Sequence, residues 1–114
     1  MLEKTLTLSQ LFDFYGSLLT SRQQEIMRLY FYQDLSLGEI AENLDISRQG
    51  VYDHLQRAEK QLQDYEEELG LFSCYQVIQK ETDCLLEGLD GEGPLSQKDR
   101  QRLLGAVKRI KNCL

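Results

Sequence analysis

Apolar side chains recur every three or four positions through most of the chain, which is the period of an amphipathic α-helix. The first stripe consists of Leu11, Phe12, Tyr15, Leu18 and Leu19, and the second consists of Ile26, Met27, Leu29, Tyr30 and Phe31. Between them, Thr20 or Ser21 together with Gln23 or Gln24 offers a capping box at a helix start. The pattern therefore predicts two successive helices.

A short helix and a long helix follow, separated by a tight turn. Ser36 and Glu39 have the spacing of another capping box, and the apolar positions of the short helix are Ile40, Ala41 and Leu44. Asp45 tolerates the left-handed backbone of a tight turn, and Ser47 is a favourable N-cap for the next helix. This order of elements predicts a helix-turn-helix.

The long helix carries an apolar stripe with heptad spacing, formed by Val51, Leu55, Ala58, Leu62, Tyr65, Leu69 and Phe72. A helix over 48–69 is ~33 Å long at ~1.5 Å per residue, and Gly70 is placed to end it. The stripe continues past the residues needed to pack the helix-turn-helix. We therefore expect its last four members, Leu62, Tyr65, Leu69 and Phe72, to be covered by the last two helices or by a second subunit.

Two further helices are predicted beyond Gly70. A fifth helix over 71–86 has Leu71, Tyr75, Ile78, Leu85 and Leu89 along one side. The segment 88–94 holds three glycines and the only proline, which is typical of a linker. Ser96 and Asp99 then open a last helix, whose inward positions are predicted to be Leu103, Val107 and Ile110.

The chain as a whole is predicted to be all-α, with five to six helices and a long recognition helix that continues into a C-terminal helical bundle. One proline and the absence of alternating β-branched runs argue against strands. The length of 114 residues suits a single domain over 1–114. We expect it to consist of a helix-turn-helix part (1–62) and a C-terminal helical extension (63–114).

Composition narrows the classes of function. No apolar stretch approaches the ~18–20 residues that span a bilayer, and the first ten residues lack the features of a secretion leader. Three widely spaced cysteines and a single histidine do not make a zinc motif. Gly-rich phosphate loops and a nucleophile–base pair at recognisable spacing are also absent. We expect a cytoplasmic protein that is not an enzyme and has no cofactor or metal.

Charge is unevenly divided along the chain. Residues 61–93 hold one basic and nine acidic side chains, whereas residues 94–114 hold six basic and one acidic. The interpretation we favour places the basic last helix against the acidic middle segment, within one molecule or across a dimer. The alternative is a basic tail that contacts nucleic acid phosphates.

Outward positions at the start of the long helix suit base recognition. Arg48 and Gln49 lie in the first turn, and these residue types pair with guanine and adenine, respectively. Ser47 and the free N–H groups of this helix end can hold a phosphate. The candidate nucleic-acid-binding residues are Ser47, Arg48, Gln49, Tyr52 and Gln56, with Arg22, Arg28 and Lys60 as further phosphate contacts.

Acidic residues weaken this interpretation. Segment 36–60 holds three basic and five acidic side chains, and Asp53 stands on the same outward face as Gln49. Because phosphate neutralisation supplies much of the affinity for DNA, such a segment binds DNA poorly without base contacts. The alternative is an adaptor that docks on a protein and does not bind DNA.

The segment 18–62 resembles region 4 of sigma-70-type factors. Residues 5–90 also resemble the YlxM-like family of small helix-turn-helix proteins. The motifs that carry this resemblance are DLSLGEIAE (34–42), SRQGVYD (47–53) and DYEEELGL (64–71). The resemblance implies an all-helical, cytoplasmic bacterial protein. It also implies participation in, or regulation of, the signal recognition particle pathway, with the particle's GTPase, its receptor or its RNA as partners. Many helix-turn-helix proteins bind DNA as homodimers, and we expect a homodimer here.

Overall fold

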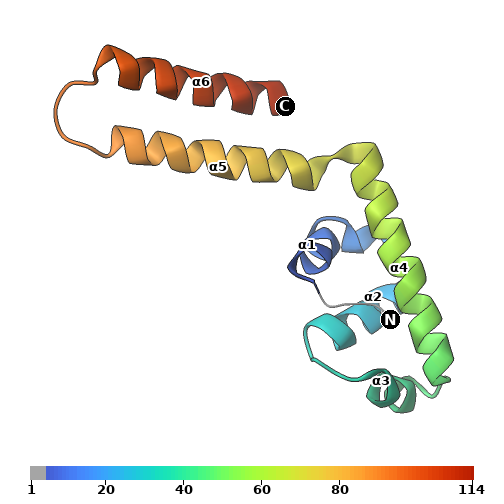
Figure 1. Cartoon of the computed structure of the whole chain (residues 1–114). Coiled ribbons are helices and arrows are strands. Elements are labelled where there is room, and N and C mark those ends of the chain that lie inside the picture. Colours follow the sequence, from blue (N-terminus) through green and yellow to red (C-terminus); the bar gives the residue numbers. More distant parts are fainter. Residues whose placement is uncertain (1–4) are drawn as a thin grey trace. The chain divides into compact units, whose positions relative to one another are not determined.

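The computed structural model describes residues 5–114, and the regular structure within that range is entirely helical (Figure 1). In chain order the elements are α1 (Leu6–Tyr15), a 3₁₀ turn (Gly16–Leu18), α2 (Ser21–Phe31), α3 (Leu37–Leu44), α4 (Arg48–Leu69), α5 (Leu71–Leu89) and α6 (Gln97–Cys113). The prediction of an all-α fold with five to six helices is confirmed. Residues 1–4, at the start of the predicted 1–62 part, lie outside the described residues.

The chain divides into two compact units at Gly70. We name the described residues before the division, 5–70, the N-terminal unit, and residues 71–114 the C-terminal hairpin. Gly70 has a φ of 61° and its N–H donates to the Glu66 carbonyl at 2.8 Å, so it ends α4 as predicted. The boundary expected between residues 62 and 63 falls inside α4. None of the described helices is long and apolar enough to cross a bilayer.

The core of the N-terminal unit forms where α1, α2 and α3 pack on α4 (Figure 1). Its buried apolar side chains are Leu8, Leu11, Phe12, Tyr15 and Leu19, then Ile26, Met27 and Tyr30, then Ile40 and Ala41, and finally Val51, Leu55, Ala58 and Leu62. The Thr20 hydroxyl accepts from the Gln23 N–H at 3.2 Å, and the Gln23 side chain accepts from the Thr20 N–H at 3.0 Å. This capping box, one of the two pairings expected, fixes the start of α2.

The end of the α4 stripe differs from the expectation. Leu62 is fully buried and Tyr65 half-buried within the N-terminal unit, because α1 packs on this stretch of α4. Tyr15, at the end of α1, donates its hydroxyl to the Glu66 carboxylate at 2.6 Å and lies with its ring centroid 6.0 Å from that of Tyr65. Leu62 therefore needs neither the last two helices nor a second subunit to cover it. The expectation that one of these covers Leu62 was wrong. Leu69 is 55% exposed, whereas Phe72, the last member of the stripe, is buried and lies in α5.

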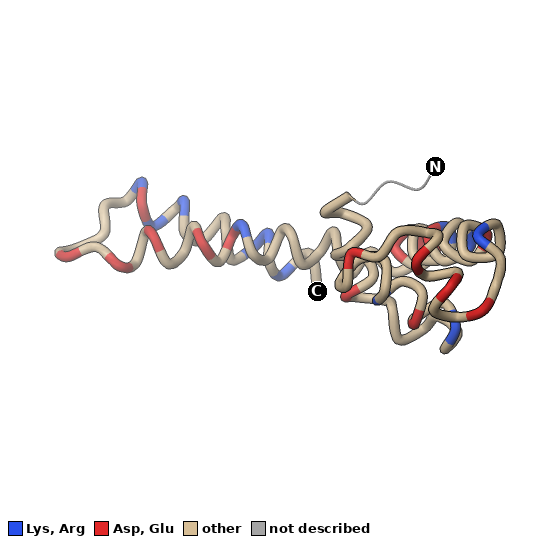
Figure 2. The backbone as a smooth tube through the Cα atoms, turned by 90° about the horizontal axis from the view of Figure 1, so that it is seen from below, with Lys and Arg blue, Asp and Glu red and all other residues tan. Residues whose placement is uncertain are grey.

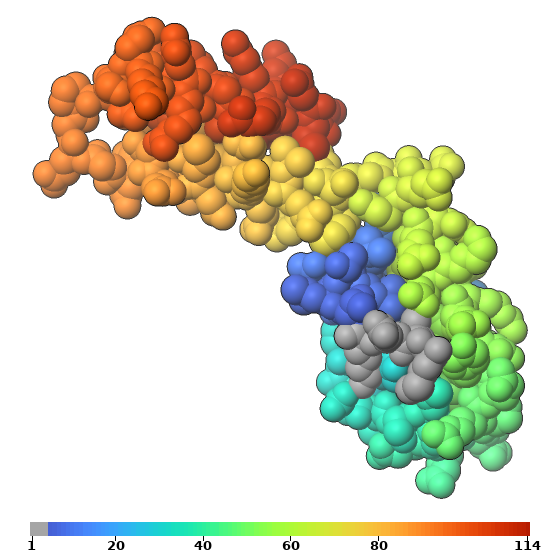
Figure 3. Space-filling view, viewed as in Figure 1, coloured from blue at the N-terminus to red at the C-terminus, as the bar shows by residue number. Residues whose placement is uncertain are grey.

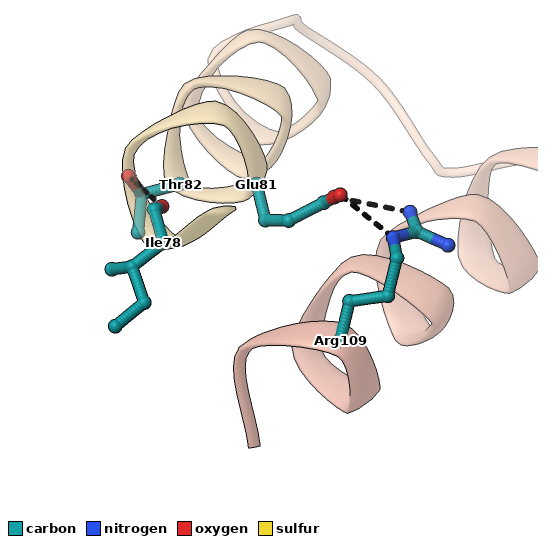
Figure 4. A network of polar contacts seen from close by, with 4 residues as sticks. All are labelled: Ile78, Glu81, Thr82 and Arg109. Carbon is teal, nitrogen blue, oxygen red and sulfur yellow. Dashed lines mark hydrogen bonds and ion pairs between the residues drawn. The ribbon is translucent and has the colours of Figure 1, made fainter. Parts of the chain in front are cut away.

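The C-terminal hairpin consists of α5 and α6, which run antiparallel (Figure 1). Near one end the Cys74 thiol donates to the Cys113 carbonyl at 2.9 Å. In the middle the Arg109 guanidinium donates to both oxygens of Glu81, at 2.7 and 3.0 Å (Figure 4). These hydrogen bonds lower the pKa of the Glu81 carboxyl. Glu81 is only 6% exposed. The thiol and the ion pair therefore hold the helices in a defined register.

One predicted inward position of the last helix was wrong. Leu103 and Ala106 are buried and Ile110 is half-buried, but Val107 is 49% exposed. A residue one place beyond an inward position lies ~100° further around the helix, and Ala106 takes the inward position in this turn. Val107 consequently stands beside the contact with α5 and does not fill it.

Candidate nucleic-acid interface

The helix-turn-helix is fixed by backbone hydrogen bonds around Asp45. Its φ of 55° is left-handed, its N–H donates to the Glu42 carbonyl at 3.4 Å, and the Ile46 N–H donates to the Ala41 carbonyl at 3.1 Å. This is the pairing of a Schellman motif, which ends α3 and redirects the chain. Ser47 then accepts from the Gly50 N–H at 2.9 Å and starts α4. The left-handed Asp45 and the Ser47 cap are confirmed.

The conformation of Asp45 leads to a stability prediction. At the positive φ of this position a β-branched side chain is strained, whereas glycine adopts the conformation readily. We expect Asp45→Val to lower the free energy of unfolding by about 1 kcal/mol or more, and Asp45→Gly to change it by less than about 0.5 kcal/mol. Urea unfolding followed by circular dichroism measures both. Equal losses in the two variants would show that the carboxylate, and not the backbone conformation, is what the position requires.

The predicted base-contacting side chains share one face at the start of α4. Arg48 and Gln49 are exposed, and with Tyr52 and Leu37 of α3 they line a shallow hollow of about 510 Å³. We call the outward residues of α4 here the recognition face: Arg48, Gln49, Tyr52, Asp53 and Gln56. Leu37 was not among the predicted site residues. Leu37 lies in the first turn of α3, and it reaches the hollow because the tight turn at Asp45 brings α3 beside the start of α4. Its spacing in the sequence does not show this.

Hydrogen bonds within the recognition face engage most of its polar groups. The Gln49 amide donates to the Asp53 carboxylate at 3.0 Å, and the Gln56 amide donates to the Tyr52 hydroxyl at 2.7 Å. Both pairs are four residues apart on the exposed surface of α4, where neighbouring side chains meet. Within residues 5–114, Arg48 makes no hydrogen bond or ion pair. Its guanidinium is therefore available to a ligand without the loss of an internal contact.

The three predicted phosphate contacts lie outside the recognition face, Lys60 one turn beyond Gln56 on the same side of α4. Arg22 and Arg28 lie on α2, where they pair with Glu25 at 3.8 Å and with Gln24 at 3.0 Å. Lys60 pairs with Asp64 at 3.2 Å, with both side chains more than half exposed. Exposed pairs of this kind contribute little stability and exchange readily with other partners. All three residues are on the surface, and their role as phosphate contacts stays a prediction.

A second hollow lies on α3 and has an acidic character. Its volume is about 370 Å³, and it is lined by Leu35, Glu39, Glu42 and Asn43. The surrounding sequence is acidic as well, since residues 1–70 hold 13 acidic and 6 basic side chains, for a net charge of −7. Figure 2 marks the acidic and basic positions along the described backbone. This side of α3 suits a basic partner and repels phosphates.

Comparison with known proteins places the chain in a family. A family model described as UPF0122, "Putative helix-turn-helix protein, YlxM / p13 like", matches residues 2–102. The chain belongs to the UPF0122 family. The identification that the sequence motifs suggested is thus confirmed, and so is the helix-turn-helix.

Relatives in the UPF0122 family match almost the whole chain. UPF0122 proteins of Bacillus cereus (strain AH187), Bacillus anthracis (strain A0248) and Bacillus thuringiensis subsp. konkukian (strain 97-27) are each 46% identical over 110 residues, which is 96% of this chain and 99% of theirs. The similarity therefore extends beyond residue 90, where the motif-based resemblance ended. The UPF0122 model itself reaches residue 102, inside α6.

Proposed function

We propose that this UPF0122 chain is a regulatory protein that binds duplex DNA through the first turns of α4. The observation that carries the proposal is the state of Arg48, which is exposed at the start of the second helix of the helix-turn-helix and has no partner within residues 5–114. In DNA-binding helix-turn-helix proteins, this end of the second helix enters the major groove. The proposal includes no enzymatic activity and no cofactor.

The recognition face supplies the contacts. Arg48 donates two hydrogen bonds to the major-groove edge of a guanine, and Gln49 leaves Asp53 to pair with an adenine. The Ser47 hydroxyl and the N–H groups of the first turn of α4 donate to a phosphate, assisted by the positive end of the helix dipole. Arg22, Arg28 and Lys60 add backbone contacts when they release their exposed partners.

The acidity of the N-terminal unit determines what kind of binding this is. A net charge of −7 over residues 1–70 makes sequence-independent binding weak, because such binding depends on phosphate neutralisation. Binding then depends on base contacts and on two copies that contact two half-sites together. These features support a sequence-specific homodimeric regulator rather than a general DNA-coating protein.

A second candidate function is supported by the acidic hollow on α3. The hollow next to Glu39 and Glu42 fits a basic protein surface, so the helix-turn-helix would serve as an adaptor that does not bind DNA. The resemblance to the YlxM-like family directs this candidate, as well as the regulator, to the signal recognition particle pathway. The particle's GTPase, its receptor and its RNA are the partners to test.

The proposed DNA binding is tested by removing the negative charge from the recognition face. We expect wild-type protein to bind fluorescently labelled duplexes that it has selected from a random pool, with an affinity that falls as salt rises. Asp53→Asn should tighten binding about threefold, because a unit charge ~8 Å from a phosphate across a wet interface is worth under ~1 kcal/mol. Fluorescence anisotropy at low and moderate salt measures both effects.

Glu67→Gln is the matched control. Glu67 is exposed on the same helix, 14 residues beyond Asp53 and therefore ~21 Å along its axis, and the substitution removes the same charge. It should leave the affinity almost unchanged. No binding at tens of micromolar, or equal effects of the two substitutions, would contradict the proposal and favour the adaptor.

A further inference from the structure

Few apolar side chains are fully buried in the contact between α5 and α6, where Ile78, Leu85 and Ile110 are only half-buried. The positions of α5 that meet α6 include Cys74, Glu81 and Gly88, which are small or polar. A Cβ on Gly88 would lie 2.6 Å from a methyl carbon of Leu103, so the helices approach closely there. On α6 the buried apolar residues are Leu103 and Ala106. A pair of helices held by so small an apolar contact needs a further surface to pack against.

Apolar side chains gather beside this contact on both helices. On α5 they are Tyr75 and Leu89, which are 42% and 60% exposed. On α6 they are Leu104 and Val107, at 52% and 49% exposed. We call these four residues the hairpin face. Single exposed apolar residues are ordinary on a surface, but several on one side of a hairpin are typical of an interaction site.

The two stripes lie on the same side of the hairpin. Tyr75 and Leu89 each come one place after a position that meets α6, and Leu104 and Val107 each come one place after a buried residue of α6. One place is ~100° around a right-handed helix. Because the helices are antiparallel, this rotation turns both stripes toward the same side. Figure 3 shows how closely the two helices pack along their length.

We propose that the hairpin face binds the hairpin face of a second copy of this chain, forming a four-helix bundle about a two-fold axis. This inference deepens the homodimer included in the proposed function, since it names the surface through which the copies meet. A two-fold contact uses the same patch on both copies. Bundles of four helices with apolar positions at spacings of three and four are a stable solution for such a face.

The distribution of charge favours a second copy as the occupant. Residues 71–114 hold seven basic and six acidic side chains, so two hairpins meet at a net charge of +1 each, whereas two N-terminal segments (1–70) would meet at −7 each. Within the hairpin, α5 carries a net charge of −2 and α6 a net charge of +5. A two-fold axis that lays α5 of one copy against α6 of the other therefore places opposite charges together twice.

The size of the face also suits a dimer. The 19 residues of α5 make a helix ~28 Å long, and two helices ~10 Å apart present a face about 20 Å wide. The projected area is about 500–600 Å², and the accessible area of such a ridged face approaches the ~800 Å² per partner of a standard specific interface. The face is therefore about large enough for a specific contact between two copies.

The test measures the mass of the full chain in solution without nucleic acid, so that failure to bind DNA cannot affect it. Sedimentation equilibrium should give twice the chain mass of 13.3 kDa for the wild type at micromolar concentrations. Leu104→Glu and Val107→Glu should each raise the dimer dissociation constant at least about tenfold, because each introduces two buried charges per dimer. Both residues are about half exposed, so the helical content by circular dichroism should not change.

Lys98→Gln is the control, since it makes the same change of charge at an exposed position of α6 that lies ~120° and ~180° around the helix from Leu104 and Val107. It should leave the dissociation constant within about twofold of the wild type. A wild-type chain that stays monomeric at tens of micromolar would overturn the proposal, because its face would then be uncovered or covered within one chain. Dimers that are equally stable in all three variants would overturn it as well, since the copies would meet elsewhere.

Discussion

Leu62→Ala is expected to lower the free energy of unfolding of the N-terminal unit by about 3 kcal/mol. The side chain is fully buried at the place where α1 packs on α4, so its removal leaves a cavity as well as a loss of transferred apolar surface. Neighbouring side chains are poorly placed to fill the space. Tyr15 is held by its hydrogen bond to Glu66 and by its ring contact with Tyr65. Urea denaturation followed by far-ultraviolet circular dichroism measures the loss.

Leu69→Ala is the matched substitution in the same helix. Leu69 has the same heptad spacing in the sequence, but it is 55% exposed, and we expect its removal to cost less than about 0.5 kcal/mol. Equal losses at the two positions would mean that α1 is not what buries the α4 stripe. A change in the slope of the unfolding free energy against urea concentration, without a change in the midpoint, would indicate an altered unfolded state and not a lost contact.

These two leucines show where prediction from the sequence succeeds and where it stops. Heptad spacing identified α4 and the buried residues Val51, Leu55 and Leu62, because the helical period alone decides which side chains share a stripe. It did not identify what covers each part of the stripe. The packing of α1 on the second half of α4 depends on how the chain turns at Gly16–Leu18, a 3₁₀ segment that has no distinctive pattern.

Turns with specific backbone requirements were predictable for a different reason. The capping boxes at Thr20 and Ser36, the left-handed Asp45 and the end of α4 at Gly70 each follow from the local chemistry of a few residues. The hairpin was harder, since Val107 and Ala106 are both plausible inward residues by period. The close contact of Gly88 with Leu103, on the other helix, favours the smaller side chain facing inward.

The candidate site was predictable in its residues but not in its internal contacts. Spacing alone places Arg48, Gln49 and Tyr52 near one another at the start of α4. The hydrogen bond from Gln49 to Asp53 depends on rotamers, and it gives Asp53 a role that the sequence suggested only as a source of repulsion. The recognition face therefore holds its glutamine internally and leaves its arginine available, which makes Arg48 the residue on which binding should depend most strongly.

Arg48→Ala is expected to weaken binding to a selected duplex by about tenfold to hundredfold, and to relax the base preference at one position of the site. A bidentate contact between arginine and guanine contributes ~1–3 kcal/mol of discrimination, and Arg48 has no internal partner within residues 5–114 that would compete for it. Selection of duplexes by the wild type from a random pool, followed by fluorescence anisotropy with both proteins, measures the affinity and the preference.

Arg57→Ala separates a base contact from a general effect of charge. Arg57 is an exposed arginine on the same helix, and nine residues, or about two and a half turns, place it on the opposite side of α4 from Arg48. It should weaken binding less than about threefold and leave the base preference unchanged, because it would remove only a distant charge. If the two variants lost affinity equally, phosphate attraction alone would explain the binding. If neither lost affinity, the interface would lie away from the start of α4, and the acidic hollow on α3 would become the surface to test.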